Sequence, residues 1–100
     1  LYSSKDLAVI VPTKDRPEHI EKLLNSLANQ VEQVKYIIII ASGKDIRDII
    51  EKFSDKLSIE YYHTSQYGQI RQRNIGISKL DKSTPLVACI DDDIIFDKSA

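Results

Sequence analysis

Three consecutive carboxylates, Asp91, Asp92 and Asp93, follow directly after five apolar residues, 86–90. The apolar run is bounded upstream by Pro85 and predicts a short strand buried on both faces, with the carboxylates at its carboxyl end. Adjacent carboxylates repel one another unless a divalent cation such as Mn²⁺ or Mg²⁺ neutralises them. Because alternate side chains of an extended segment point the same way, Asp91 and Asp93 could chelate one ion while Asp92 faces elsewhere. The alternative is a solvated acidic turn.

A second group of residues that could take part in binding or catalysis is basic. Residues 68–76 place Arg71, Arg73 and Asn74 within one helical turn of each other. The guanidinium group suits phosphate oxygens, and a helix beginning near Gly68 would add its N-terminal dipole to anion binding. The alternative is a solvated basic face.

The elements that must position these residues can be predicted from periodicity. Four apolar runs alternate with three segments of helical periodicity, which predicts a parallel sheet covered by helices. The predicted strands are residues 7–11, ended by Pro12, and residues 34–41, 58–63 and 86–90. A strand order of 3-2-1-4 would leave a crevice between Pro12–Arg16 and Asp91–Asp93, at the point where the order reverses.

Each intervening segment has a predicted buried stripe. The first helix should begin with a capping pair, Asp15 and Glu18, and the second with Ser42 and Asp45. The stripe of the first helix comprises Ile20, Leu23, Leu24 and Leu27, and that of the second comprises Ile46, Ile49, Ile50 and Phe53. The weaker third helix, residues 68–80, carries Ile70, Ile77 and Leu80.

Composition excludes several functions. Fourteen basic and fifteen acidic residues give a net charge of −1, so no global field recruits nucleic acid. The three glycines, Gly43, Gly68 and Gly76, form neither a dinucleotide-binding turn nor a P-loop, which disfavours nicotinamide dehydrogenases and P-loop NTPases. Cys89 lies in an apolar run and is expected in the core, and a cytoplasmic location fits a single cysteine. The longest apolar stretch, 36–41, is far below the roughly 18 residues of a membrane span.

The length of 100 residues suits one domain or a part of one. The chain begins at Leu1 without a methionine and ends seven residues after Asp93, where more of such a fold would be expected. We therefore expect residues 1–100 to be the N-terminal part of a larger domain.

Three motifs in order carry a family resemblance: Val9–Pro17, then Gly68 through Arg73-Asn74-x-Gly76, then an apolar strand into Asp91–Asp93. Together they resemble family 2 glycosyltransferases over nearly the whole chain. The resemblance implies a GT-A fold, a three-layer, Rossmann-like parallel sheet, whose N-terminal half binds a nucleotide-diphospho-sugar donor. The aspartate triplet would then be the D-x-D motif of the family.

The resemblance also implies residue roles. Asp93 would hold the divalent ion on the donor diphosphate, with Asp91 or Asp92 near the ribose, and Thr13 would lie near the nucleoside. Lys14 stands where family members often have an aromatic residue, and we expect it to meet phosphate. Ala41 and Ser42 replace a frequent aspartate pair, so the identity of the base is open. The expected substrate-binding set is Pro12, Thr13, Lys14, Arg16, Ser42, Gly68, Arg71, Arg73, Asn74, Asp91 and Asp92, and the expected metal ligands are Asp91 and Asp93.

The expected function is metal-dependent binding of a donor, foremost a UDP-sugar, for transfer of the sugar to a sugar, lipid or polysaccharide acceptor. A divalent ion stabilises the leaving diphosphate, and a general base must activate the acceptor hydroxyl. No base can be assigned here, so we expect it outside this chain, and the chain alone to bind donor without catalysis. The expected location is the cytoplasm or the inner face of the membrane.

Three alternatives remain open at this point. A haloacid-dehalogenase-like phosphatase would use Asp91-x-Asp93, although that family usually has Thr or Val where this chain has Ile95. A nucleotidyltransferase would use similar metal geometry but lacks a basic glycine-rich loop here. A non-catalytic nucleotide-binding fragment would expose a sheet edge that invites self-association.

Overall fold

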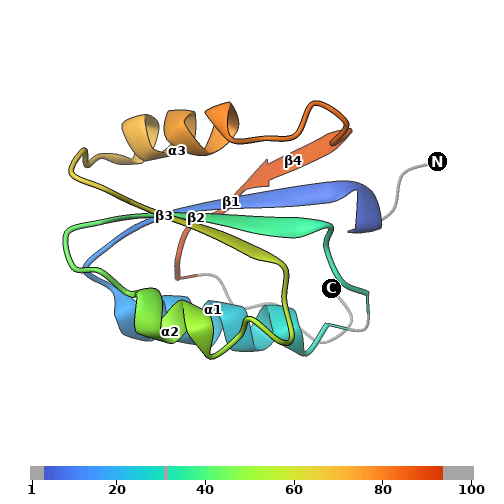
Figure 1. Cartoon of the computed structure of the whole chain (residues 1–100), viewed down its shortest axis with the longest axis horizontal. Coiled ribbons are helices and arrows are strands. Elements are labelled where there is room, and N and C mark those ends of the chain that lie inside the picture. Colours follow the sequence, from blue (N-terminus) through green and yellow to red (C-terminus); the bar gives the residue numbers. More distant parts are fainter. Residues whose placement is uncertain (1–3, 31, 94–100) are drawn as a thin grey trace.

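The computed structural model describes residues 4–30 and 32–93, which form a four-stranded parallel sheet with the order β3-β2-β1-β4. Helices α1 and α2 cover one face and α3 covers the other (Figure 1). This arrangement confirms the predicted α/β fold and its strand order. The elements are β1 (Leu7–Lys14), α1 (Pro17–Ala28), β2 (Tyr36–Ser42), α2 (Arg47–Glu51), β3 (Ile59–Thr64), α3 (Gln69–Ser78) and β4 (Leu86–Cys89), with a 3-10 turn at Ser4–Asp6.

The centre of the sheet is formed by β1 and β2, which pair from Ala8 opposite Tyr36 to Lys14 opposite Ser42. The isoleucines of β2 are fully buried because helices cover both faces. Ile37 and Ile39 pack into the cluster beneath α1 and α2, whereas Ile38 and Ile40 belong to the cluster beneath α3. A run of four β-branched residues therefore serves two separate cores.

Strand β1 does not end at Pro12, as the sequence had suggested, but continues to Lys14. The Ile10 carbonyl accepts a hydrogen bond from the Ile90 amide, so the backbone at Ile10, and two residues on at Pro12, faces the β4 side. Pairing with β4 ends at Cys89, so the missing proline N–H removes no ladder bond. The extension carries Thr13 and Lys14 out to the carboxyl edge.

The stripe of α1 is buried as predicted, but the capping pair expected at Asp15 is wrong. Asp15 has φ of 53° and its Oδ1 accepts a hydrogen bond from the Lys44 amide at 2.8 Å. The N-cap of α1 is Arg16, which makes no side-chain cap, and Pro17 occupies the first turn. A partner distant in sequence therefore competes successfully for the Asp15 carboxylate.

The capping box expected for α2 is also wrong. Ser42 lies within β2, and Asp45 Oδ1 accepts hydrogen bonds from the Arg47 amide and the Tyr61 hydroxyl. The helix is short, yet Phe53 remains buried in the turns that follow it. The predicted apolar pattern is thus preserved although the helix is not continuous.

Helix α3 differs from its predicted stripe. Ile70 and Ile77 are 71% and 48% exposed, whereas Gln72 is buried and faces the sheet. Gly76 is also buried, and a Cβ atom added there would lie 2.5 Å from Ile10 Cγ2. The helix therefore contacts the sheet through a glycine and a glutamine. Ile75 and Leu80, which are only partly buried, pack against the same apolar cluster.

Strand β4 is not buried on both faces, contrary to the prediction. It pairs only with β1 within the described residues and forms an edge of the sheet, with Val87 43% exposed. Cys89 is exposed rather than in the core. Self-association through this edge stays a prediction.

Across the described residues, the helices are too short or too polar for any of them to cross a bilayer. The location of the protein in the cell stays a prediction.

Candidate functional site

A pocket of about 290 Å³ opens at the carboxyl edge of the sheet, on the boundary between β1 and β4. This is the crevice that the reversal of strand order predicted. Its lining residues are Pro12, Thr13, Lys14, Arg16, Tyr67, Gly68, Gln72 and Asp92.

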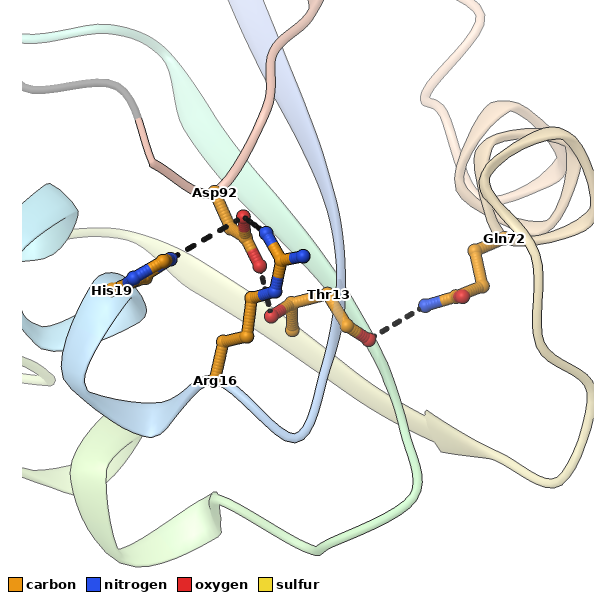
Figure 2. Close-up of polar contacts among 5 residues, drawn as sticks. All are labelled: Thr13, Arg16, His19, Gln72 and Asp92. Carbon is orange, nitrogen blue, oxygen red and sulfur yellow. Dashed lines mark hydrogen bonds and ion pairs between the residues drawn. The ribbon is translucent and has the colours of Figure 1, made fainter.

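Asp92 is the buried carboxylate of the pocket, with only 6% of its surface exposed. It accepts hydrogen bonds from Thr13 Oγ1 at 2.7 Å and from Arg16 Nη1 at 3.2 Å (Figure 2). His19 Nδ1 lies 3.9 Å from the same carboxylate. Because a buried polar group requires partners, these contacts explain how the Asp92 carboxyl group is accommodated.

Asp92 is buried and lines the pocket, whereas Asp91 and Asp93 are exposed. The middle carboxylate is thus separated from the other two, as alternation predicted, but it faces the pocket in their place. The strand itself ends at Cys89, and Asp92 and Asp93 form a turn. No cluster of three acidic, histidine or cysteine side chains suited to a metal occurs among residues 4–30 and 32–93. Metal binding by Asp91 and Asp93 stays a prediction.

Gln72 forms the opposite wall of the pocket. Its Nε2 donates hydrogen bonds to the Thr13 and Ile40 carbonyls, both at 2.8 Å. Its Oε1 accepts a hydrogen bond from the Gly68 amide at 3.2 Å. Gly68 precedes α3 with φ of 110°, a backbone conformation that favours glycine. The amide of Gln72 thus joins the ends of β1 and β2 to the start of α3.

Two cationic side chains line the same pocket. Lys14 Nζ lies 4.2 Å from the centroid of the Tyr67 ring, which is 64% exposed. The Arg16 side chain is 56% exposed while it contacts Asp92. Both charged groups are therefore accessible to an anion that enters the pocket.

The structure brings together only part of the expected set. Pro12, Thr13, Lys14, Arg16, Gly68 and Asp92 line the pocket, whereas Ser42, Arg71, Arg73, Asn74, Asp91 and Asp93 do not. The two arginines and Asn74 are exposed because α3 turns Gln72 and Gly76 to the sheet. The Ser42 hydroxyl is buried and has no hydrogen-bond partner among the described residues.

Sequence reasoning missed Tyr67 and Gln72. Gln72 lies one helical turn before Gly76, and that spacing could have identified the face of α3 that approaches the sheet. Tyr67 carries no comparable pattern, because its position follows from the loop before α3.

A second polar group fixes the loop between β2 and α2. The Tyr61 hydroxyl donates to Asp45 Oδ1 at 2.7 Å and accepts from the Ile46 amide at 3.0 Å. Desolvation, with the hydrogen bond to Asp45, raises the pKa of Tyr61 to about 12. The same hydrogen bond lowers the pKa of Asp45. Within the part of the chain that the structure describes, Asp45, Ile46 and Tyr61 are not among the residues that line the pocket.

The pocket as a whole combines one partnered carboxylate, a hydroxyl, the side-chain amide of Gln72 and two accessible cations. Such a set can bind a ligand that carries both hydroxyl groups and negative charge.

The family model for Glycosyl transferase family 2 matches residues 8–100, and the chain belongs to that family. The resemblance found in the sequence is thereby confirmed. An uncharacterized glycosyltransferase of Rickettsia bellii (strain RML369-C) is 29% identical over 92 residues, which cover 90% of this chain and 13% of that protein.

Solved structures agree with this assignment. S. aureus TarS 1-349 in complex with UDP superposes with a TM-score of 0.76 and 25% identity, over 93% of this chain and 29% of that one. The same TarS segment has been solved in complex with UDP-GlcNAc, with a TM-score of 0.69 and 25% identity, over 87% and 26% of the two chains. The mannosyltransferase PcManGT from Pyrobaculum calidifontis, in complex with GDP-Man and Mn²⁺, superposes with a TM-score of 0.78 and 16% identity, over 91% of this chain and 28% of that one. At this identity the likeness supports the fold alone. This chain thus spans less than a third of the length of these relatives.

Proposed function

We propose that this chain is the donor-binding part of a glycosyltransferase and that its pocket binds a nucleotide-diphospho-sugar, a UDP-sugar foremost. The observation that carries the proposal is the buried Asp92, partnered by Thr13 and Arg16, in a pocket that Lys14 also lines. Membership of the glycosyl transferase family and the UDP and UDP-GlcNAc complexes of TarS support it.

The lining residues have separate tasks in this proposal. Lys14 and Arg16 bind the diphosphate oxygens, since both are cationic and accessible. Asp92 accepts a hydrogen bond from a ribose hydroxyl while Thr13 holds the carboxylate in place. Gly68 lets the ligand approach the backbone closely, because no side chain projects from it.

The proposed cofactor is Mn²⁺ or Mg²⁺, held by Asp93 with Asp91. Carboxylate oxygens suit both ions, and such sites commonly complete their coordination with substrate phosphates and water. The two exposed carboxylates beside the pocket therefore fit an ion that binds together with a diphosphate better than an ion held by protein alone. When bound, the ion would neutralise charge on the departing diphosphate.

The sugar would pass to an acceptor hydroxyl of a sugar, lipid or polysaccharide. The general base for that step is proposed to lie outside these 100 residues, so the chain contributes donor binding to a larger catalytic domain. Family membership argues against the phosphatase and nucleotidyltransferase alternatives. A cytoplasmic location is consistent with use of nucleotide-sugars.

The test is calorimetric titration with UDP, GDP and dTDP, with and without Mn²⁺. We expect one nucleotide to bind in a metal-dependent way and to lose affinity by at least about tenfold in Asp93→Ala, because removing one carboxylate ligand weakens the ion site. Lys14→Ala should weaken diphosphate binding with or without metal. Asp55→Ala, at an exposed carboxylate in the turns after α2, is the matched control and should bind as the wild type does.

Two results would count against the proposal. Equal nucleotide affinity in the wild type and Asp93→Ala would remove Asp93 from the metal site. Metal binding that does not depend on nucleotide would favour the phosphatase alternative.

A further inference from the structure

A chain of polar contacts links the two walls of the pocket. The Thr13 hydroxyl donates a hydrogen bond to Asp92, the Thr13 carbonyl accepts one from the Gln72 side-chain amide, and the oxygen of that amide accepts one from the Gly68 amide. Figure 2 shows its central part, with Thr13 between Asp92 and Gln72. All four residues line the pocket, so the two walls are linked by polar contacts.

Gln72 connects the two walls through three hydrogen bonds of its side-chain amide. Only 3% of its surface is exposed, both hydrogens of its amide group have acceptors, and its oxygen has a donor. Burial of an amide group costs free energy unless its hydrogen bonds are made. The Gln72 side chain therefore keeps its three partners at fixed positions relative to one another. Those partners come from β1, β2 and the residue that begins α3.

The packing of α3 explains why this link matters for the pocket. Gly76 supplies no side chain, and Ile70 and Ile77 point away from the sheet, so apolar contacts give the helix little lateral restraint. Ile75 and Leu80 pack toward the C-terminal part of the helix. Near its beginning, where the pocket lies, the buried side chain of Gln72 joins α3 to the strands.

We propose that Gln72 is a positioning residue for donor binding, which sets the distance between the wall at Thr13 and Asp92 and the wall at Gly68. The inference rests on the proposed function for its ligand. It assigns to Gln72 no contact with the reacting atoms. Its effect passes through the backbone of Thr13 and Gly68.

The experiment compares Gln72→Met with Gln33→Met. Gln33 also donates its Nε2 to two backbone carbonyls, those of Leu27 and Gln30, but it lies after α1 and lines no part of the pocket. We expect the dissociation constant for UDP with Mn²⁺ to rise at least about tenfold in Gln72→Met and to stay within about twofold in Gln33→Met, since only the first change releases pocket residues. Thermal unfolding checks that both variants are folded at the assay temperature.

A second readout does not depend on nucleotide. In NMR spectra of the protein, Gln72→Met should shift the Gly68 amide signal, because its acceptor is lost. Gln72→Glu keeps an acceptor for Gly68 and loses the donors to Thr13 and Ile40, so it should move the Thr13 signals more than those of Gly68. Gln33→Met should change neither.

The outcomes separate the two hypotheses. Wild-type affinity in folded Gln72→Met would overturn the positioning role, as would unchanged Gly68 and Thr13 signals. A wild-type protein that binds none of the nucleotides would overturn the proposed function, and the NMR shifts would then decide alone whether Gln72 fixes the two walls.

Discussion

The two faces of the sheet are built from different interactions. Among the residues that the structure describes, thirteen buried apolar residues form the cluster under α1 and α2, whereas five form the cluster under α3. Leucines of α1 fill the first interface, but α3 meets the sheet mainly through Gln72 and Gly76. One face is therefore joined by apolar area and the other by directional polar contacts.

This difference separates the apolar interior of the α1 face, which stabilises the fold, from the polar contacts that join α3 to the pocket. Apolar burial is roughly proportional to area and tolerates small displacements, whereas hydrogen bonds specify distance and angle. One wall of the pocket, at Gly68 and Gln72, lies on the polar side, whereas Asp92 contacts Arg16 and His19 at the start of α1. Substitutions in the apolar cluster of the α1 face, away from these two residues, should thus change the free energy of unfolding without changing ligand affinity, and substitutions under α3 should change both.

The largest effect on stability is expected from Leu23→Ala. Leu23 is fully buried in the larger cluster, and truncation there should lower the free energy of unfolding by about 2–5 kcal/mol. Urea denaturation measures this loss, and nucleotide titration of the folded variant should give the wild-type affinity. The neighbouring exposed Lys22→Ala should stay within about 0.5 kcal/mol of the wild type. A changed nucleotide affinity in Leu23→Ala would break the proposed separation of the faces.

Gly76→Ala tests the opposite face. The new Cβ would lie 2.5 Å from Ile10 Cγ2, so α3 or the strand must shift, at a cost of about 1–3 kcal/mol. Because Gly68 and Gln72 adjoin the same helix, nucleotide affinity should fall as well. Ile77→Ala is the control on this helix, since that side chain is 48% exposed and should alter neither property appreciably. If Gly76→Ala lost stability at unchanged affinity, the pocket would be independent of how α3 is seated.

The better-packed face was also the more predictable one. The stripe of α1 could be predicted because apolar residues at helical spacing must face the core wherever the helix lies. The same reasoning failed for α3, where Ile70 and Ile77 have the spacing of a stripe but a buried glutamine takes their place. Periodicity measures apolar burial, so it has no means of recognising an interface made by an amide and a glycine.

The site shows the same limit. The crevice and the participation of Thr13, Arg16 and Asp92 followed from the strand order and the family motifs. Alternation separated Asp92 from Asp91 and Asp93 but could not show that Asp92 is the one that faces inward, because its Thr13 and Arg16 partners are more than 70 residues away in the sequence. Local capping patterns at Asp15 and Asp45 failed for a similar reason, as distant groups bind both carboxylates.

The smallest effect on stability is expected at Tyr61, whose hydroxyl makes polar contacts next to the larger apolar cluster. Tyr61→Phe keeps the ring against the larger cluster and removes the hydroxyl that bonds Asp45 and the Ile46 amide. Because these hydrogen bonds are partly solvated, the loss should be about 1 kcal/mol or less, with nucleotide affinity unchanged. Urea denaturation at neutral pH measures it.

The pH dependence of the stability difference between the wild type and Tyr61→Phe sharpens the test. The pKa of Tyr61 is raised from 10.0 to about 12 on folding, chiefly by desolvation, so the folded state favours the neutral phenol. The contribution of the Tyr61 hydroxyl to the free energy of unfolding is fully present below pH 10 and is lost as the pH rises from about 10 to about 12. The stability difference between wild type and Tyr61→Phe should therefore be constant up to pH 9 and shrink at pH 11. The remaining tyrosines are common to both proteins, so a difference that stayed constant up to pH 11 would show that the hydroxyl is not held as described, and that this face depends on apolar packing alone.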